Sequence, residues 1–212
     1  MDKATARLAE KPVKTSKGEP FTDRDLRETA ANALYEPTMT EAFLEGVAQL
    51  ERTGKIQDLE VIQTLSNLGG GESDGATVAI NCADDPVRPT DPEREYRNVS
   101  KQLAAQAPYF GPLAAGNAIA CAGFPVGTDY IRNIDKPEGA PKILVIGGKH
   151  DPATPYAWAK QTADRLGSGV LMTYEGQGHG AYPASKCVRG KVDRFFADGT
   201  VPPHDARSCP AE

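Results

Sequence analysis

Two short segments of the sequence hold residue types that could together carry out acid–base catalysis. Asp151 lies within the run 148–155, and His179 follows later in the chain, between Gly178 and Gly180. A hydroxyl is a poor nucleophile at neutral pH, and an imidazole beside it can take its proton. A carboxylate on the other side of the ring fixes the tautomer and stabilises the imidazolium that forms. Asp151 and His179 are therefore predicted to be the acid and the base of nucleophilic catalysis.

Each of these residues also has an ordinary structural explanation. Asp151 could cap a helix that begins near Pro155, and His179 could be a loop histidine with no catalytic role. The catalytic hypothesis is favoured because both residues occur together, each in a matching context. The other two histidines, His150 and His204, lack such a context and are expected to be solvated loop residues.

The segments around the pair alternate between strand and helix patterns. Apolar runs at 142–146 and 170–174 are typical of strands, and each is soon followed by one of the two candidate residues. Residues 156–166 between them have apolar side chains near one helical stripe. Strand ends in a rigid sheet can hold loop side chains in a fixed geometry. We therefore expect the carboxylate of Asp151 to lie within hydrogen-bond reach of Nδ1 of His179.

A nucleophile that would complete the pair is not evident in the sequence. Ser73 satisfies the pattern Gly-x-Ser-x-Gly within residues 71–75, but that motif works only where a strand feeds a sharp turn and a helix follows. Residues 56–68 before it have helical spacing, and residues 76–80 after it look extended, which is the reverse order. Two acidic neighbours would also oppose formation of an alkoxide. An independent enzyme that uses Ser73 is therefore an unfavoured hypothesis.

Several motifs together resemble the tripeptidyl-aminopeptidase-like branch of the α/β-hydrolases, secreted serine exopeptidases that remove short peptides from free N-termini. The resemblance rests on Asp-Pro-Ala-Thr-Pro at 151–155, Gly-His-Gly at 178–180, and the segments 79–84, 107–111 and 198–202. It extends over nearly the whole chain. The sequence departs from the family at Phe124-Pro125, where the family usually has Trp-Pro, and it has no counterpart of the family's N-terminal half, which carries the oxyanion loop and the nucleophile elbow.

The resemblance implies an α/β protein with a partial α/β-hydrolase fold, namely the C-terminal strands and helices of a parallel sheet with a mainly helical cap. The implied organisation is a connector at 1–20 with no core to bury, a helical cap region with a disulfide-tied loop at 21–139, and the C-terminal part of the hydrolase core at 140–212. Helical patterns occur at 22–35, 38–52, 56–68, 93–106 and 184–197.

The two predicted core strands are too few for a self-sufficient parallel sheet. A two-stranded parallel unit cannot bury both of its faces. Residues 143–146 also have the continuous apolar character of a strand that is covered on both faces and paired on both edges. We therefore expect the rest of the sheet to come from elsewhere. A partner chain, a split or processed precursor, and a truncated sequence are all compatible with this expectation.

The chain has four cysteines, and none of them is in Cys-x-x-Cys spacing, which argues against zinc and thioredoxin chemistry. Four cysteines allow three pairings, and four reduced thiols are the alternative. The family resemblance favours Cys82–Cys121 and Cys187–Cys209. Paired cysteines indicate an oxidising compartment, so an extracellular or cell-envelope location is expected, although the N-terminus is polar and does not look like a signal peptide.

Composition restricts the possible partners. The net charge of −5 argues against nucleic acid and anionic membranes. No apolar run approaches the ~20 residues of a membrane span. No cofactor and no metal site are expected.

The function that the family resemblance implies is the C-terminal portion of a secreted serine exopeptidase, and without a nucleophile the chain is expected to be inactive by itself. Asp151 and His179 would serve a triad whose serine comes from outside this sequence, and the substrate would be a peptide with a free N-terminus. A carboxylate would have to hold that ammonium group, and Glu36, Asp84 and Asp85 are candidates, although a solvated or capping acid is the favoured interpretation of each. The alternative is a non-catalytic binding or scaffold protein that kept the family's fold and lost its chemistry.

Overall fold

The computed structural model describes residues 1–68, 75–126 and 137–212. It divides into two compact units, one formed by Met1–Asn32 with Phe43–Ile134 and the other by Ala33–Ala42 with Asp135–Glu212. Each unit has its own core and is described separately below. No helix among the described residues is long and apolar enough to cross a membrane.

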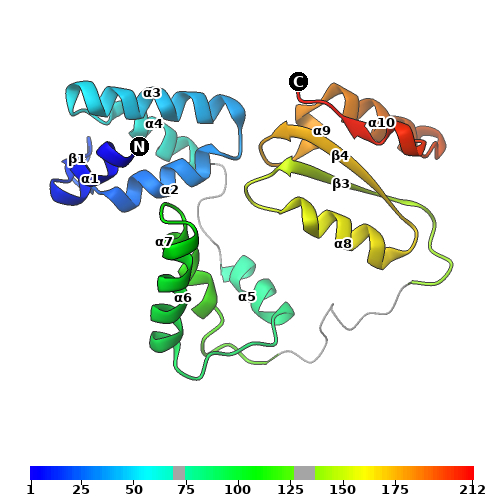
Figure 1. The fold of residues 1–212 in the computed structure, drawn as a ribbon, viewed down its shortest axis with the longest axis horizontal. Coiled ribbons are helices and arrows are strands. Elements are labelled where there is room, and N and C mark those ends of the chain that lie inside the picture. The colour runs from blue at the N-terminus through cyan, green and yellow to red at the C-terminus, as the bar shows by residue number, and fades with distance from the viewer. Residues whose placement is uncertain (69–74, 127–136) are drawn as a thin grey trace. The chain divides into compact units, whose positions relative to one another are not determined.

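The first unit is mainly helical (Figure 1). Its elements are α1 (Asp2–Glu10), β1 (Val13–Lys14), β2 (Pro20–Phe21), α2 (Asp23–Ala33), α3 (Pro37–Thr53), α4 (Gln57–Leu68), α5 (Gly75–Asp84), α6 (Pro92–Gln106), α7 (Gly111–Ala114) and the 3-10 helix η1 (Ala115–Ile119). The last residue of α2 and the first turns of α3 belong to the second unit.

The core of the first unit explains why its N-terminal helices form. Leu8 of α1, Leu26 of α2 and Leu50 of α3 are completely buried, at the apolar positions of amphipathic helices. The helix α2 begins with a capping box, in which the backbone N–H of Thr22 donates to the carboxylate of Asp25 over 2.7 Å. The prediction that residues 1–20 bury no core is wrong, because α1 is amphipathic and its residue Leu8 is buried in the core of the first unit.

The segment 76–80, predicted to be extended, is helical. It lies in α5, whose residue Cys82 is buried and bonded to Cys121. The guanidinium of Arg88, just beyond this helix, donates to several backbone carbonyl oxygens around the disulfide, including those of Cys82, Phe124 and Pro125. The disulfide and Arg88 together hold α5 to the chain that follows η1.

The second unit contains a three-stranded parallel sheet in the order β3-β4-β5. Its elements are β3 (Ile143–His150), α8 (Tyr156–Leu166), β4 (Gly169–Gln177), α9 (Ala181–Ala184), α10 (Lys186–Asp198), the 3-10 helix η3 (His204–Ala206) and β5 (Ser208–Cys209). The strands at 142–146 and 170–174 and the helices at 156–166 and 184–197 are therefore confirmed within a few residues. The short strand β5 was not predicted.

Helices cover both faces of this sheet (Figure 1). On one face, Met172 and Tyr174 of β4 pack with Val188 and Val192 of α10 in a buried cluster. On the other face, the hydroxyl groups of Tyr156 in α8 and Thr173 in β4 are 2.7 Å apart. Successive residues of β4 thus point to opposite layers, as the pleat of a strand requires.

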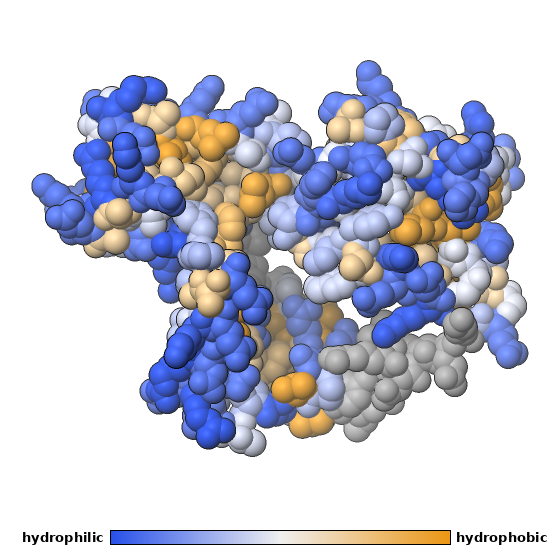
Figure 2. Space-filling model, viewed as in Figure 1, coloured by the Kyte–Doolittle hydropathy of each residue, from blue (hydrophilic) through white to orange (hydrophobic). Residues whose placement is uncertain are grey.

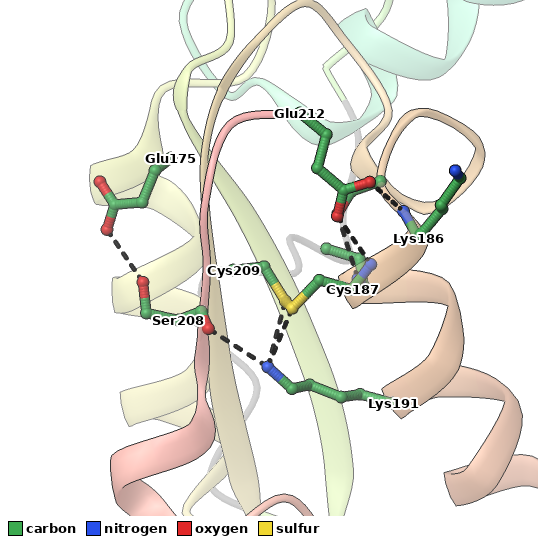
Figure 3. Close-up of a disulfide and its surroundings, with 9 residues drawn as sticks. Glu175, Lys186, Cys187, Lys191, Ser208, Cys209 and Glu212 are labelled. Atoms are coloured by element: carbon green, nitrogen blue, oxygen red, sulfur yellow. Dashed lines mark hydrogen bonds between the residues drawn. A yellow bond between two sulfur atoms is a disulfide. The ribbon is translucent and has the colours of Figure 1, made fainter.

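The disulfide Cys187–Cys209 joins α10 to β5 (Figure 3). Nζ of Lys191 lies 3.1 Å from Sγ of Cys187 and donates to the carbonyl oxygen of Ser208 over 3.2 Å. The carboxylate of Glu212 accepts the backbone N–H groups of Lys186 and Cys187 at the start of α10. A negative charge at this end of a helix is stabilising, so both contacts fix the helix that follows His179.

Candidate active site

Asp151 follows directly after the last residue of β3, and its carboxylate is held by the loop that leads into α8. Oδ1 accepts the backbone N–H groups of Ala153 at 2.8 Å and Thr154 at 2.9 Å. Oδ2 accepts the hydroxyl of Thr154 at 2.8 Å. Local turn chemistry of Asp and Thr produces this arrangement, and it fixes the direction in which the carboxylate points.

His179 lies just beyond the end of β4, with Nδ1 facing Asp151. Nδ1 is 3.0 Å from Oδ1 and 2.9 Å from Oδ2 of Asp151. The two residues meet because β3 and β4 are parallel neighbours that pair His150 with Gln177 at their carboxyl ends. The predicted approach of the carboxylate to Nδ1 is confirmed.

Hydrogen bonds keep the carboxylate of Asp151 ionised although its side chain is only 7% exposed. Burial raises the pKa of Asp151, but the hydrogen bonds from Thr154, His179 and Ala153 together outweigh burial and leave the pKa below its ordinary value. An ionised carboxylate only accepts hydrogen bonds, so Nδ1 must carry the proton. Nε2 of the neutral ring is then the acceptor, on a side chain that is 41% exposed.

The glycine before His179 allows a close backbone contact. Gly178 has φ of +95°, and a Cβ atom built there would lie 2.8 Å from the carbonyl oxygen of Tyr35. Gly180 has a φ of +91° but open space around it. Both positions therefore need glycine for their backbone conformation, whereas only Gly178 needs it for the approach of another segment.

Tyr35, which the sequence does not mark as a site residue, contacts His179 in two ways. Its carbonyl oxygen accepts the backbone N–H of His179 at 2.8 Å. Its ring meets the imidazole edge-on, with centroids 5.3 Å apart and an interplanar angle of 70°. A main-chain acceptor can be supplied by any residue type, so no sequence pattern could have pointed to it.

The remaining candidates are not joined to this pair. His150 and His204 are exposed, and no hydrogen bond within the described ranges links either of them to Asp151 or His179. Glu36 is exposed and belongs to the same unit as His179, whereas Asp84 and Asp85 belong to the other unit.

A nucleophile is likewise not part of the described geometry. Ser73 lies outside the described residues. No serine hydroxyl of the residues that are described is hydrogen-bonded to His179. In the same part of the chain, no group of three or more His, Cys, Asp or Glu side chains could hold a metal ion.

Comparison with protein families places this geometry in context. Residues 107–209, which contain both Asp151 and His179, match the family described as TAP-like protein. Carboxylesterase B of Mycobacterium tuberculosis is 32% identical over 215 residues, which cover 96% of this chain and 40% of that relative. The chain therefore spans about two fifths of the length of this curated relative.

Two further relatives have names that refer to peptide cleavage. Serine protease Hip1 of Mycobacterium tuberculosis is 27% identical over 185 residues, 82% of this chain and 35% of its own length. Tripeptidyl aminopeptidase of Streptomyces lividans is 23% identical over 153 residues, 71% of this chain and 28% of its own length. The relatives thus have hydrolase names, and each is considerably longer than the part that matches.

Proposed function

Because residues 107–209 belong to the TAP-like family of hydrolases, we propose that Asp151 and His179 are the acid and the general base of a serine hydrolase. The observation that carries this proposal is the contact of Nδ1 with both carboxylate oxygens of Asp151, at 2.9 and 3.0 Å. It leaves Nε2 as the only ring nitrogen that can take a proton.

In the acylation step His179 moves one proton and Asp151 moves none. Nε2 takes the proton of a serine hydroxyl as its oxygen attacks the substrate carbonyl, and it then gives that proton to the leaving amine or alkoxide. The acyl group left on the serine is then hydrolysed by water, with His179 repeating the same proton relay. Asp151 stays ionised, holds the Nδ1–H tautomer and stabilises the imidazolium between these steps. The low pKa of Asp151 suits this role, because a carboxylate that held a proton could no longer favour the cation.

The serine would come from polypeptide that pairs with the free edge of β3. Among the described strands, β3 pairs only with β4, although its sequence is that of a strand with two neighbours. Ile143 at its start is 37% exposed, and a groove of about 380 Å³ beside it is lined mainly by apolar side chains: Ile143, Leu144, Ile146, Tyr182, Val192, Phe195 and Phe196. Figure 2 shows hydrophobic residues, in orange, on the surface between α10 and the sheet. This surface fits a neighbouring strand and the helix that would cover it.

The substrate class that we favour is a peptide with a free N-terminus. Serine esterases and serine peptidases use the same catalytic residues and differ in the leaving group, so the pair itself is compatible with both activities. An exopeptidase also needs an acid for the substrate's ammonium, and Glu36, next to Tyr35 in the chain, is the candidate that shares a unit with His179. The two disulfides support an extracellular or cell-envelope location, where such bonds persist.

A fluorophosphonate probe, which labels activated serines, tests this proposal. The isolated chain is expected to remain unlabelled. A chimaera in which this chain replaces the matching segment of Carboxylesterase B is expected to be labelled, and H179N in the chimaera is expected to abolish labelling. Labelling of Ser73 in the isolated chain would favour an independent enzyme. A folded chimaera without labelling, beside a labelled parent relative, would favour a non-catalytic remnant.

A further inference from the structure

The geometry points to Tyr35 as a positioning residue for His179, a role that rests on the proposed function of the Asp151–His179 pair. Tyr35 lies between α2 and α3 in the sequence, far from both members of the pair. Its contribution would be to hold the imidazole in the one orientation that keeps Nδ1 on Asp151 and Nε2 available to a nucleophile.

The first part of the argument is the main-chain contact. The loop Gly178–Gly180 follows the end of β4, where the ladder of the sheet no longer fixes the backbone. The backbone N–H of His179 instead donates to the carbonyl oxygen of Tyr35 at 2.8 Å. This bond fixes the Cα position from which the His179 side chain projects. The absence of a side chain at Gly178 is what permits the approach, because a Cβ atom there would lie 2.8 Å from the same oxygen.

The second part is the contact between the rings. The imidazole is 41% exposed, so bulk packing does not determine its rotamer. Asp151 holds it at Nδ1, and the ring of Tyr35 meets it edge-on at 5.3 Å between centroids. Such edge-to-face pairs are favourable beyond the area that they bury. A ring held at Nδ1 by a hydrogen bond and along its side by an aromatic group cannot swing away from this position without losing both contacts.

The third part is that the segment carrying Tyr35 is itself well fixed. The hydroxyl of Thr40 donates to the carbonyl oxygen of Ala33 at 2.8 Å. The backbone N–H of Thr40 donates to the carbonyl oxygen of Glu36 at 3.0 Å. Pro37 is the first residue of α3, a position where its fixed φ favours helix formation. The carbonyl of Tyr35 is thus presented by a preorganised turn.

The phenol hydroxyl has no part in either contact, so phenylalanine should replace Tyr35 without loss. Alanine should keep the carbonyl contact and lose the ring contact. The two variants therefore separate the aromatic ring from the hydroxyl and leave the main chain in place.

Nitrogen-detected NMR of the isotope-labelled chain measures the outcome directly. The imidazole nitrogen shifts of His179, assigned by their disappearance in H179N, report which nitrogen carries the proton at a pH where the ring is neutral. His150 and His204 in the same spectrum serve as internal references. The expected result is a predominant Nδ1–H form in the parent chain and in Y35F, and a ratio of Nδ1–H to Nε2–H lowered about 2- to 10-fold in Y35A.

A pair of glycine variants tests the main-chain contact with a matched control. G178A and G180A both place a side chain at a positive φ, but only the former collides with Tyr35. G178A is expected to lower the tautomer ratio as Y35A does, and G180A is expected to leave it near that of the parent chain. Equal losses in both glycine variants would trace the effect to strain in the loop and overturn the role of Tyr35.

An unchanged ratio in a folded Y35A chain would also overturn the inference. If Y35A does not fold, Y35F and the glycine pair still decide it. The readout needs no nucleophile, so its failure leaves the proposed hydrolase function untouched. Conversely, a chimaera that is inactivated by H179N but keeps its kcat in Y35A would contradict only the role of Tyr35.

Discussion

Asp151 and His179 meet in a carboxylate–imidazole contact of 2.9 Å although each is fixed by a different loop. The Asp151 carboxylate is held within its own turn by hydrogen bonds from Ala153 and Thr154, which do not involve His179. His179 is placed by the end of β4 and by the carbonyl oxygen of Tyr35. The pair is therefore assembled from two preorganised halves, and each half can be disturbed separately.

Asp151→Ala is expected to destabilise the second unit by about 1–2 kcal/mol, because it removes the acceptor of two backbone N–H groups and of the Thr154 hydroxyl. Asp151→Asn keeps one oxygen for the backbone groups and should cost less. Trp158, the single tryptophan, lies in α8, so its fluorescence during urea unfolding reports this unit. An equal decrease in the free energy of unfolding in both variants would contradict the conclusion that the Asp151 carboxylate stabilises the turn by accepting these hydrogen bonds.

The stability of the second unit should fall with acid in a way that depends on Asp151. Its pKa is lowered by folding, so it contributes stability above the ordinary pKa of about 4, and this contribution is lost as the pH falls through the lower folded value. Urea unfolding of the parent chain and Asp151→Asn at a series of pH values measures this. The variant should take up fewer protons on unfolding, by up to about one. Parallel curves of the free energy of unfolding against pH for the two proteins would show that Asp151 does not cause the loss of stability in acid.

Loss of the Cys187–Cys209 disulfide should destabilise the second unit by about 3 kcal/mol, because the bond closes a loop between residues 22 positions apart. The matched control is loss of Cys82–Cys121, which lies in the first unit. The double alanine variant of Cys187 and Cys209 should shift the unfolding transition that Trp158 reports. The double alanine variant of Cys82 and Cys121 should leave that transition in place. A shift of the same size in both would show that the units do not unfold separately.

Arg88→Ala should loosen the chain around the Cys82–Cys121 disulfide, because several carbonyl oxygens lose a charged donor at once. Hydrogen exchange of a peptide covering residues 120–126 should become faster. Lysine at this position keeps the charge but lacks the forked donors, so it should rescue little. Arg94→Ala on the exposed surface of α6 is the control and should have no effect. Slow exchange in Arg88→Ala would contradict this role.

The strands and helices of the second unit could be predicted because their signals are local. Continuous apolar runs and a helical stripe define β3, α8 and β4, and parallel strand ends then bring Asp151 and His179 together. The strand β5 could not be predicted, since two residues carry no periodicity. It forms because Tyr174 pairs with Cys209 and the disulfide holds that residue against α10.

In the first unit, the error at 76–80 has a physical cause. Thr77, Val78 and Ile80 are β-branched and favour strands weakly, but tertiary context overrides such propensity. Here the context is Cys82, buried and tied to Cys121 at a distance in the sequence. The role of α1 was missed for a related reason, because its narrow apolar stripe becomes visible only when α2 and α3 supply the rest of the core.

The central claim, that His179 is the general base of a serine hydrolase, is tested most directly by the turnover rate of the chimaera with Carboxylesterase B. Hydrolysis of a p-nitrophenyl ester and of a tripeptide p-nitroanilide would be followed in the parent chimaera and in its H179N and H150N variants, after each is shown to unfold cooperatively. The account predicts that H179N lowers kcat by about 10³-fold or more while H150N leaves it nearly unchanged. An H179N chimaera that turns over as fast as its parent would contradict it.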